Sequence, residues 1–184
     1  MTITAPAGTY LLGQMLTADY SCADAGSGIA SCSNAVPSGG IVNTRTVGSQ
    51  SFTVTATDRV GNSASLAGAY AVVYNICPLY DAGVAKKSGS AYPIKLQLCD
   101  AAGANLSTSS VVVHAVGVTH VSSNTPALLD DTGNANPDGD FRYDATANAY
   151  VFNLSTKGYA TGVYSLMFTA GSDTTVHSVM FAIK

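Results

Sequence analysis

The chain has 184 residues, of which only 10% are charged and 47% are hydrophobic. Its net charge is −3 and it carries no basic cluster, which argues against nucleic acid or an anionic membrane surface as a partner. No apolar run approaches the ~20 residues of a transmembrane helix. Ser, Thr, Val, Ala and Gly dominate, a composition that favours short strands and predicts an all-β fold.

The first half of the chain reads as one small module of six or seven strands. Residues 51–57 alternate with period two, so Phe52, Val54 and Ala56 share one face. Residues 58–62 form a predicted tight turn, and a last strand runs from residue 63 to about 74. Strands are also expected near residue 3, over 16–22 and over 41–44. This density of short strands predicts a Greek-key β-sandwich.

Several motifs in this half resemble the immunoglobulin-like domains of secreted bacterial proteins, of the hyalin-repeat type. The matching segments are residues 3–6 (ITAP), 10–14 (YLLGQ), 20–24 (YSCAD), 28–32 (GIASC) and 53–62 (TVTATDRVGN). The resemblance implies a spacer or adhesion module. It specifies architecture and not a ligand.

A domain boundary is expected at Asn75, giving an N-terminal domain over residues 1–74 and a C-terminal domain over 75–184. Residues 72–78 pass directly from one strand into the next without a Gly/Ser-rich spacer, so the two domains should sit close and move little. The chain begins almost inside a strand, with no signal peptide, and we expect it to be part of a longer protein.

The second half is organised around a strand over residues 91–99. Tyr92, Ile94, Leu96 and Leu98 share one face of it, in strict alternation with polar neighbours. Further strands are expected over residues 76–80, 111–120, 141–143, 150–154, 164–169 and 179–183. Strict alternation over 111–120 would put Val112, His114, Val116, Val118 and His120 on one face. Tyr164, near the start of a late strand, resembles a tyrosine corner; a simple core tyrosine is the alternative.

This half resembles a second secreted bacterial immunoglobulin-like family, named for a Pro-x-Lys-Phe motif. The motif reads PIKL at residues 93–96, with Leu96 in place of the usual Phe. Residues 87–90, 141–144, 150–158 and 162–166 also fit in order. The resemblance implies a C-terminal β-sandwich on exported multidomain proteins and implies no catalysis. Together the two halves predict tandem immunoglobulin-like β-sandwiches.

Four cysteines allow three disulfide pairings. Cys22 and Cys32 are centred on Ser27, and Cys77 and Cys99 lie symmetrically about the turn at 87–89. Residues placed in this way face each other in an antiparallel hairpin, so disulfides 22–32 and 77–99 are predicted, each stabilising by roughly 3 kcal/mol. They would imply export; four reduced cysteines in the cytosol are the alternative.

Two sets of oxygen-bearing side chains are candidate calcium ligands. Asn134, Asn136, Asp138 and Asp140, with Gly139 among them, resemble the first half of a calcium loop. The twelfth position of that loop is alanine and not glutamate, and a solvated turn-rich loop is the simpler reading. A second set, Asp24, Asp58 and Asn62, could meet at one end of the first sandwich and bind calcium near a domain junction; the alternative is a plain hairpin turn.

No pattern points to catalysis. The three histidines, His114, His120 and His177, are too scattered to predict a zinc site. Serines lack the Gly-x-Ser-x-Gly setting of a nucleophile, and no phosphate-binding glycine loop is present. Ten tyrosines offer an alternative function, because Tyr80, Tyr143 and Tyr159 could be exposed as a sugar-binding platform. Core packing of these tyrosines is the competing reading.

The sequence therefore supports three hypotheses. The first is a non-enzymatic spacer or adhesion segment of an exported multidomain bacterial protein, secreted or at the cell surface, whose partners are other domains of the same protein. The second is a glycan- or peptide-binding module that recognises a glycan or a protein surface. The third adds calcium as a structural ion at residues 134–140. No other cofactor, no nucleic acid and no membrane insertion is expected.

Overall fold

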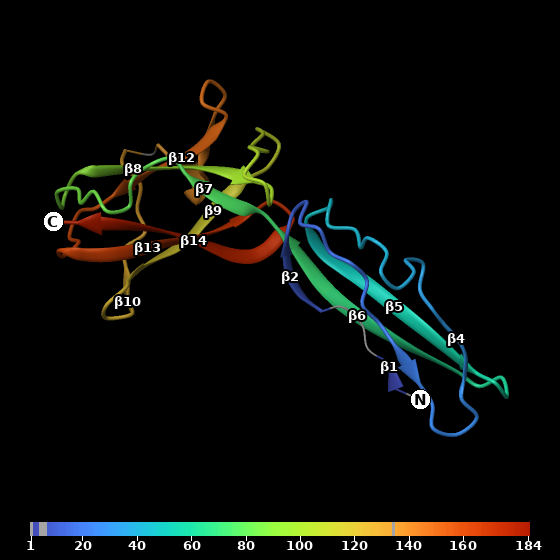
Figure 1. Cartoon of the computed structure of the whole chain (residues 1–184). Helices are drawn as coiled ribbons and strands as arrows, with labels where there is room; N and C mark the ends of the chain where they lie inside the picture. The colour runs from blue at the N-terminus through green and yellow to red at the C-terminus, as the bar shows by residue number, and fades with distance from the viewer. Residues whose placement is uncertain (1, 4–6, 134) are drawn as a thin grey trace. The chain divides into compact units, whose positions relative to one another are not determined.

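The computed structural model describes residues 2–3, 7–133 and 135–184 of the chain (Figure 1). The predicted all-β fold is confirmed: among these residues the only helical element is the short 3₁₀ turn η1 (Pro137–Gly139). The chain divides into two compact units, Met1–Val73 and Tyr74–Lys184.

Unit 1 consists of a four-stranded sheet and a facing layer of short segments. The strand order of the sheet is β2 (Gly8–Leu11), β6 (Ser63–Val73), β5 (Gly48–Asp58) and β4 (Ile29–Ser33). β2 runs parallel to β6, and the other neighbours are antiparallel. The facing layer contains the short pair β1 (Thr2–Ile3) and β3 (Cys22–Ala23), and an isolated bridge between Thr17 and Ile41.

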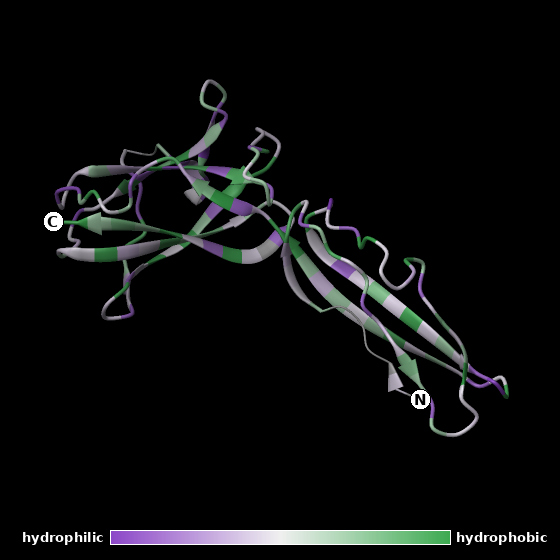
Figure 2. Cartoon of the chain, in the orientation of Figure 1, coloured by the Kyte–Doolittle hydropathy of each residue, from purple (hydrophilic) through white to green (hydrophobic). Residues whose placement is uncertain are grey.

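The core of unit 1 follows from the alternation along β5. Phe52, Val54 and Ala56 are buried, while Thr53, Thr55 and Thr57 lie on the opposite face, so the predicted facing is confirmed. Figure 2 shows this alternation as bands of contrasting hydropathy along the strand. The core cluster among the described residues contains Ala18, Tyr20, Val42, Phe52, Val54, Tyr70 and Val72.

Unit 2 is a sandwich of two four-stranded antiparallel sheets. One has the order β11 (Arg142–Asp144), β12 (Ala149–Ser155), β8 (Ala91–Cys99), β7 (Asn75–Pro78). The other has the order β10 (Thr125–Ala127), β9 (Val113–His120), β13 (Gly162–Ala170), β14 (Asp173–Ile183). The first, second, fifth and sixth strands of the unit thus form one sheet, and the third, fourth, seventh and eighth form the other. This is the strand distribution of an immunoglobulin-like sandwich.

The predicted central strand of unit 2 is confirmed. Tyr92, Ile94, Leu96 and Leu98 are each at most 2% exposed, because every second residue of β8 faces the other sheet. Tyr164 forms the predicted tyrosine corner: its hydroxyl donates a hydrogen bond to the carbonyl of Ala160, four residues upstream, over 3.0 Å. Both β8 and β13 pack into one continuous core.

The predicted facing of residues 111–120 is wrong, because β9 contains a bulge. Gly117 lies opposite Met167, whereas Ala115 lies opposite Phe168, so Val116 is an extra residue between them. Val113, Ala115 and Val118 are therefore buried, and Val116 is 46% exposed. After Val116, each side chain of β9 lies on the face opposite to the one that strict alternation predicts.

The cysteines expected to pair are disulfide-bonded, with Cα separations of 5.8 Å for Cys22–Cys32 and 6.2 Å for Cys77–Cys99. The expected hairpin geometry is wrong in both cases. Cys22 in β3 and Cys32 in β4 belong to different sheets, so their bond joins the two layers of unit 1. Cys77 lies opposite Gln97 and not opposite Cys99, so the second bond crosses two neighbouring strands diagonally.

Candidate functional site

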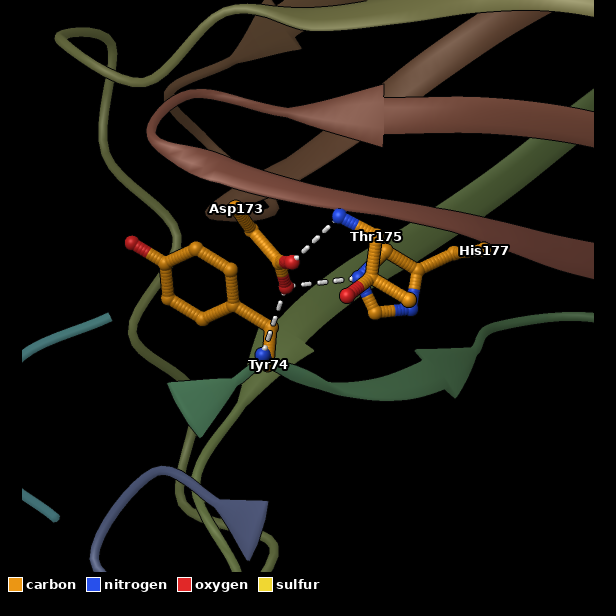
Figure 3. Close-up of polar contacts among 4 residues, drawn as sticks. All are labelled: Tyr74, Asp173, Thr175 and His177. Atoms are coloured by element: carbon orange, nitrogen blue, oxygen red, sulfur yellow. Dashed lines mark hydrogen bonds and ion pairs between the residues drawn. The ribbon is translucent and has the colours of Figure 1, made fainter. Parts of the chain in front are cut away.

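A buried carboxylate organises the beginning of unit 2 (Figure 3). Asp173 starts β14 and is 1% exposed. Its Oδ2 atom accepts a hydrogen bond from the backbone N–H of Tyr74 over 3.0 Å and lies 2.7 Å from Nε2 of His177. Its Oδ1 atom accepts a bond from the backbone N–H of Thr175, also over 3.0 Å. The carboxylate thus ties the first residue of the unit to its last hairpin.

Strand periodicity explains how this cluster forms. Asp173 and His177 stand four residues apart on β14, which puts both on the inner face of the strand. The imidazole of His177 stacks on Phe168 with a centroid distance of 5.8 Å. Burial, and in addition the negative charge of Asp173, raise the pKa of Tyr74. The sequence analysis missed this cluster; its only signal is an acid after a Gly-Ser turn with a histidine four residues on, inside an apolar strand.

The predicted set Asp24, Asp58 and Asn62 does come together, through a serine. Ser27 Oγ lies 3.3 Å from Oδ2 of Asp24 and 2.9 Å from Oδ2 of Asp58. Asn62 donates to Asp58 from its backbone and from its side-chain amide, each over 2.8 Å. Val60 donates a further backbone bond over 3.0 Å. These donors outweigh burial and, with the Asn62 amide as the largest cause, lower the pKa of Asp58 to about 2.

This geometry is that of a capped turn. Both carboxylate oxygens of Asp58 face hydrogen-bond donors, which is how an aspartate stabilises a tight turn. The turn lies between β5 and β6, at the end of β6 opposite to Val73, where the chain leaves unit 1. The turn therefore lies away from the connection to unit 2, and its contacts fit the plain-turn alternative.

The predicted calcium loop is engaged in closing a sheet edge. Asn136 is 4% exposed; its Nδ2 donates to the carbonyls of Val151 and Asp140, and its Oδ1 accepts from the backbone N–H of Asn153. The side chain thereby pairs with β12 much as a neighbouring strand would. Asp140 Oδ1 lies 2.7 Å from Nδ1 of His114. Asn134 lies outside the described residues.

A shallow pocket of about 450 Å³ lies beside this loop, lined in part by Asp130, Asp131 and Asp138. No three His, Cys, Asp or Glu side chains of the described ranges lie so as to hold a metal ion. Two of the three described members of the predicted calcium set turn to different partners, Asn136 to β12 and Asp140 to His114, and the third, Asp138, lines the pocket. Calcium at this loop stays a prediction.

The three histidines have separate structural roles, as expected from their scatter. His114 pairs with Asp140 and His177 with Asp173. His120 Nδ1 lies 2.7 Å from Ser123 Oγ, while its Nε2 is buried without a hydrogen-bond partner. A Cβ atom at Gly162 would approach Nε2 to 2.2 Å, so the ring occupies the space that any other side chain would need.

The tyrosines do not form the exposed platform considered for sugar binding. All ten are buried or half-buried. Tyr80 donates to the carbonyl of Met180 over 2.8 Å, and Tyr143 packs edge-on against Tyr150. Tyr159 is 6% exposed, and burial raises its pKa to about 12. Tyr159 is therefore buried, as the core-packing alternative predicts, and Tyr80 and Tyr143 are half-buried.

No family model matches the chain, and no curated protein matches it. Solved structures with some similarity include a fragment of the I-band of titin, at 10% identity and a TM-score of 0.34, with 99% of this chain and 65% of that one covered. Extracellular domains 3–5 of Drosophila OTK match at 11% identity and a TM-score of 0.37, with 98% and 60% covered. The Yersinia pseudotuberculosis adhesin InvE matches at 14% and 0.35, with 99% and 58% covered.

The chain spans less than two thirds of the length of each of these three structures. Within the described residues, no helix is long and apolar enough to cross a membrane.

Proposed function

We propose that the chain is a non-enzymatic spacer or adhesion segment of an exported multidomain bacterial protein, where it holds neighbouring domains apart. One observation carries the proposal: the buried polar side chains of the described residues all bond to main-chain groups. These side chains are Thr44, Asp58, Ser107, Asn136, Thr156 and Asp173. Polar groups that fix the backbone hold a shape, whereas catalytic groups must keep an atom free for substrate.

The connection between the units supports a role under tension. β6 ends at Val73 and β7 begins at Asn75, so Tyr74 is the only residue between them. The carbonyl of Val73 accepts a bond from Leu12, within unit 1, and the N–H of Tyr74 donates to Asp173, within unit 2. A pull along the chain would therefore reach hydrogen bonds of both units without first extending a slack linker.

The cysteines support export. All four form disulfides within their own units, and such bonds persist in oxidising compartments. Each also shortens the length of chain that a unit can release on unfolding. The loops closed by the disulfides span 10 residues in unit 1 and 22 in unit 2.

Single-molecule stretching of the whole chain tests the proposal. We expect two separate unfolding events, one for each unit. Reduction should lengthen the event of unit 1 by about 30 Å and that of unit 2 by about 73 Å, because each loop extends to ~3.6 Å per residue and the disulfide already spans 5.8 or 6.2 Å of it. Variants with each cysteine pair replaced by alanine should reproduce one increment each. Extension without resolvable force peaks would contradict a mechanical role.

The edge of β14 favours peptide binding as a second candidate function. Lys86 and Tyr80 already bond to the carbonyls of Ala182 and Met180, so the part of this edge that a peptide could use lies before residue 180. The side chains of Val176 and Met180 along the same strand are 55% and 53% exposed. An extended peptide could add a strand at such an edge. Slowed amide exchange at residues 176–180 on addition of a bound peptide would support this candidate.

A further inference from the structure

The first segment of unit 2, residues 75–88, lies along the edges of both sheets of the unit, and we call it the strap. It begins as β7, which pairs with β8 and forms the edge of its sheet. It ends beside β14, where the N–H of Lys86 donates to the carbonyl of Ala182 over 3.0 Å. The N–H of Ser88 also donates to the carbonyl of Lys184 over 3.1 Å. The strap therefore leaves one sheet at its edge and joins the other at its edge.

The strap contributes little to the core of unit 2. The structure describes all residues from 75 to 88, and none of them is buried. In β8, by contrast, every second residue is buried against the facing sheet. Ile76 and Tyr80 are partly buried and pack against the core cluster. Detachment of the strap would therefore break edge hydrogen bonds and these side-chain contacts, while the buried residues of the two sheets would stay in contact.

The disulfide between Cys77 and Cys99 fixes the strap covalently to the core. Cys77 lies within β7, whereas Cys99 ends β8 and is 1% exposed. The bond closes a loop that contains residues 78–98, and hence most of the strap. Tension that enters unit 2 at Tyr74 and leaves it at Lys184 therefore passes from Cys77 to Cys99 through the sulfur atoms. The backbone of residues 78–98 lies outside this path and is not stretched.

Reduction of this disulfide would put the strap into the path of tension. Residues 86–88 run parallel to the end of β14, with Lys86 opposite Ile183. Tension would pull Lys86 toward the start of the chain and Ile183 toward its end, so the hydrogen bonds between the two segments would be sheared. The ladder between β13 and β14 extends along the whole of both strands and is much longer. The strap should therefore detach before the sheets separate.

We propose that the Cys77–Cys99 disulfide is a redox-sensitive latch that decides whether unit 2 yields to tension in one step or in two. While the bond is intact, the strap is held and the unit opens as a whole. Once a dithiol reductant has opened the bond, the strap is released first and the core opens in a later step. The inference rests on the proposed function, because it concerns a chain under tension. It deepens that function by giving unit 2 a reserve of length that depends on the redox environment.

The redox step uses a dithiol as the reductant. One thiolate attacks the sulfur of Cys77, the half-buried partner, and the sulfur of Cys99 leaves as a thiolate and takes up a proton. The second thiol of the reductant then displaces the Cys77 sulfur from the mixed disulfide. Two electrons and two protons pass to the cysteines, and the reductant ends as a disulfide.

Unit 1 provides an internal comparison. Its strand β2 runs parallel to β6, the strand that leads to unit 2. The loop closed by Cys22 and Cys32 spans residues 23–31 and contains neither β2 nor β6. Tension therefore shears β2 against β6 whether that disulfide is closed or open. Reduction should add an unfolding step in unit 2 and none in unit 1.

Single-molecule stretching of the whole chain tests the latch. The double variant Cys77→Ala/Cys99→Ala should show an early step at lower force than the main event of unit 2. Its length should be at most about 50 Å, the extended length of residues 75–88 at ~3.6 Å each. The wild-type chain with both disulfides intact and the matched control Cys22→Ala/Cys32→Ala should lack this step. An early step in the intact wild type, or none in the double variant, would overturn the proposal.

An insertion locates the step in the strap. Five glycine and serine residues added after Ala82, in an exposed turn, should lengthen the early step of the double variant by about 18 Å. The same insertion in the intact wild type should lengthen no event, because it lies inside the closed loop. An unchanged early step in the double variant would assign that step to another segment and overturn the proposal.

A second measurement covers the case in which the double variant does not fold. Wild-type molecules are folded with both disulfides, held at low tension and then exposed to a dithiol reductant. The early step should appear in the pulls that follow reduction, and its absence would refute the latch. Two ordinary unfolding events without an early step would leave the spacer role standing, whereas extension without force peaks would refute the spacer role itself.

Discussion

The two units reach the same kind of fold with very different amounts of core. Among the described residues the core cluster of unit 1 has seven members, whereas that of unit 2 has 19. Unit 2 closes its core between two full sheets, while the second layer of unit 1 consists of two-residue strands and a single bridge. The disulfide of unit 1 joins its two layers; that of unit 2 only joins neighbouring strands. A small core therefore depends more on its covalent link.

Removal of one core aromatic from each unit should expose this difference most strongly. Phe52 and Phe152 are 4% and 1% exposed, and Phe→Ala at either position should cost about 3–5 kcal/mol. Phe52→Ala should unfold unit 1, because its small core has little stability to lose, whereas Phe152→Ala should leave unit 2 folded but less stable. Denaturant unfolding followed by NMR signals of each unit would measure both. An intact unit 1 in the Phe52 variant would contradict the comparison.

Removal of the disulfides should give the next largest effect. Replacing Cys22 and Cys32 by alanine should destabilise unit 1 by about 3 kcal/mol, a larger share of its stability than the other disulfide contributes to unit 2. Replacing Cys77 and Cys99 should lower the melting temperature of unit 2 but leave it folded, because both sheets and the core remain. Calorimetry of the two double variants checks this, and equal fates of the two units would argue against it.

Removal of the buried carboxylate of unit 2 should destabilise the protein less than removal of a core aromatic or of a disulfide. Asp173→Ala would leave the N–H groups of Tyr74 and Thr175 without their acceptor and should cost about 1–3 kcal/mol. Lys157→Ala, at an exposed position in the same unit, should change stability by no more than ~0.5 kcal/mol. Chemical denaturation of the two variants provides the measurement. Similar losses would mean that the cluster adds nothing to the unit.

Acid should act on unit 1 through Asp58. Its pKa falls from 3.8 to about 2 on folding, so the stability it contributes is present above pH 3.8 and is lost as the pH falls through 2. The melting temperature of unit 1 should therefore decline across that window. Asp58→Asn should flatten the decline, and a slope unchanged by this variant would exclude Asp58 as its source.

The smallest expected effect is that of calcium removal on the stability of unit 2. Asn136 and Asp140 already bond within the protein, so we expect a calcium chelator to leave the melting temperature of unit 2 unchanged. A fall of several degrees on chelation, reversed by added calcium and not by magnesium, would instead establish an ion at residues 134–140.

The sequence predicts local periodicity well and long-range pairing poorly. The alternation of β8 and the corner at Tyr164 follow from spacing within a few residues, and both were predictable. The bulge at Val116 could not be predicted, because the neighbouring valines are all equally suited to either face of the strand. The adjacent Gly117 is the only sequence feature that hints at an irregularity there. The sequence also could not show that Cys22 and Cys32 lie in different layers, because this depends on strand pairing across the whole fold.

The candidate site shows the same limit. Oxygen-rich spacing suggested a calcium loop, but the Asn136 amide faces a strand edge that only the folded chain brings near it. Tyr80, Tyr143 and Tyr159 pack against core residues distant in sequence, so composition could not show that they are covered. Asp173 and Tyr74 are in contact although they lie near opposite ends of the sequence of unit 2, so no local pattern predicts the contact.

The contact between His120 and Gly162 has a consequence for how this protein can vary. Since Nε2 of the imidazole lies 2.2 Å from where a β-carbon at position 162 would stand, and φ of Gly162 is +158°, Gly162→Ala should require both the ring and the backbone to move. A smaller side chain at position 120 would remove the clash but not the backbone strain, so glycine at 162 is favoured with either residue at 120.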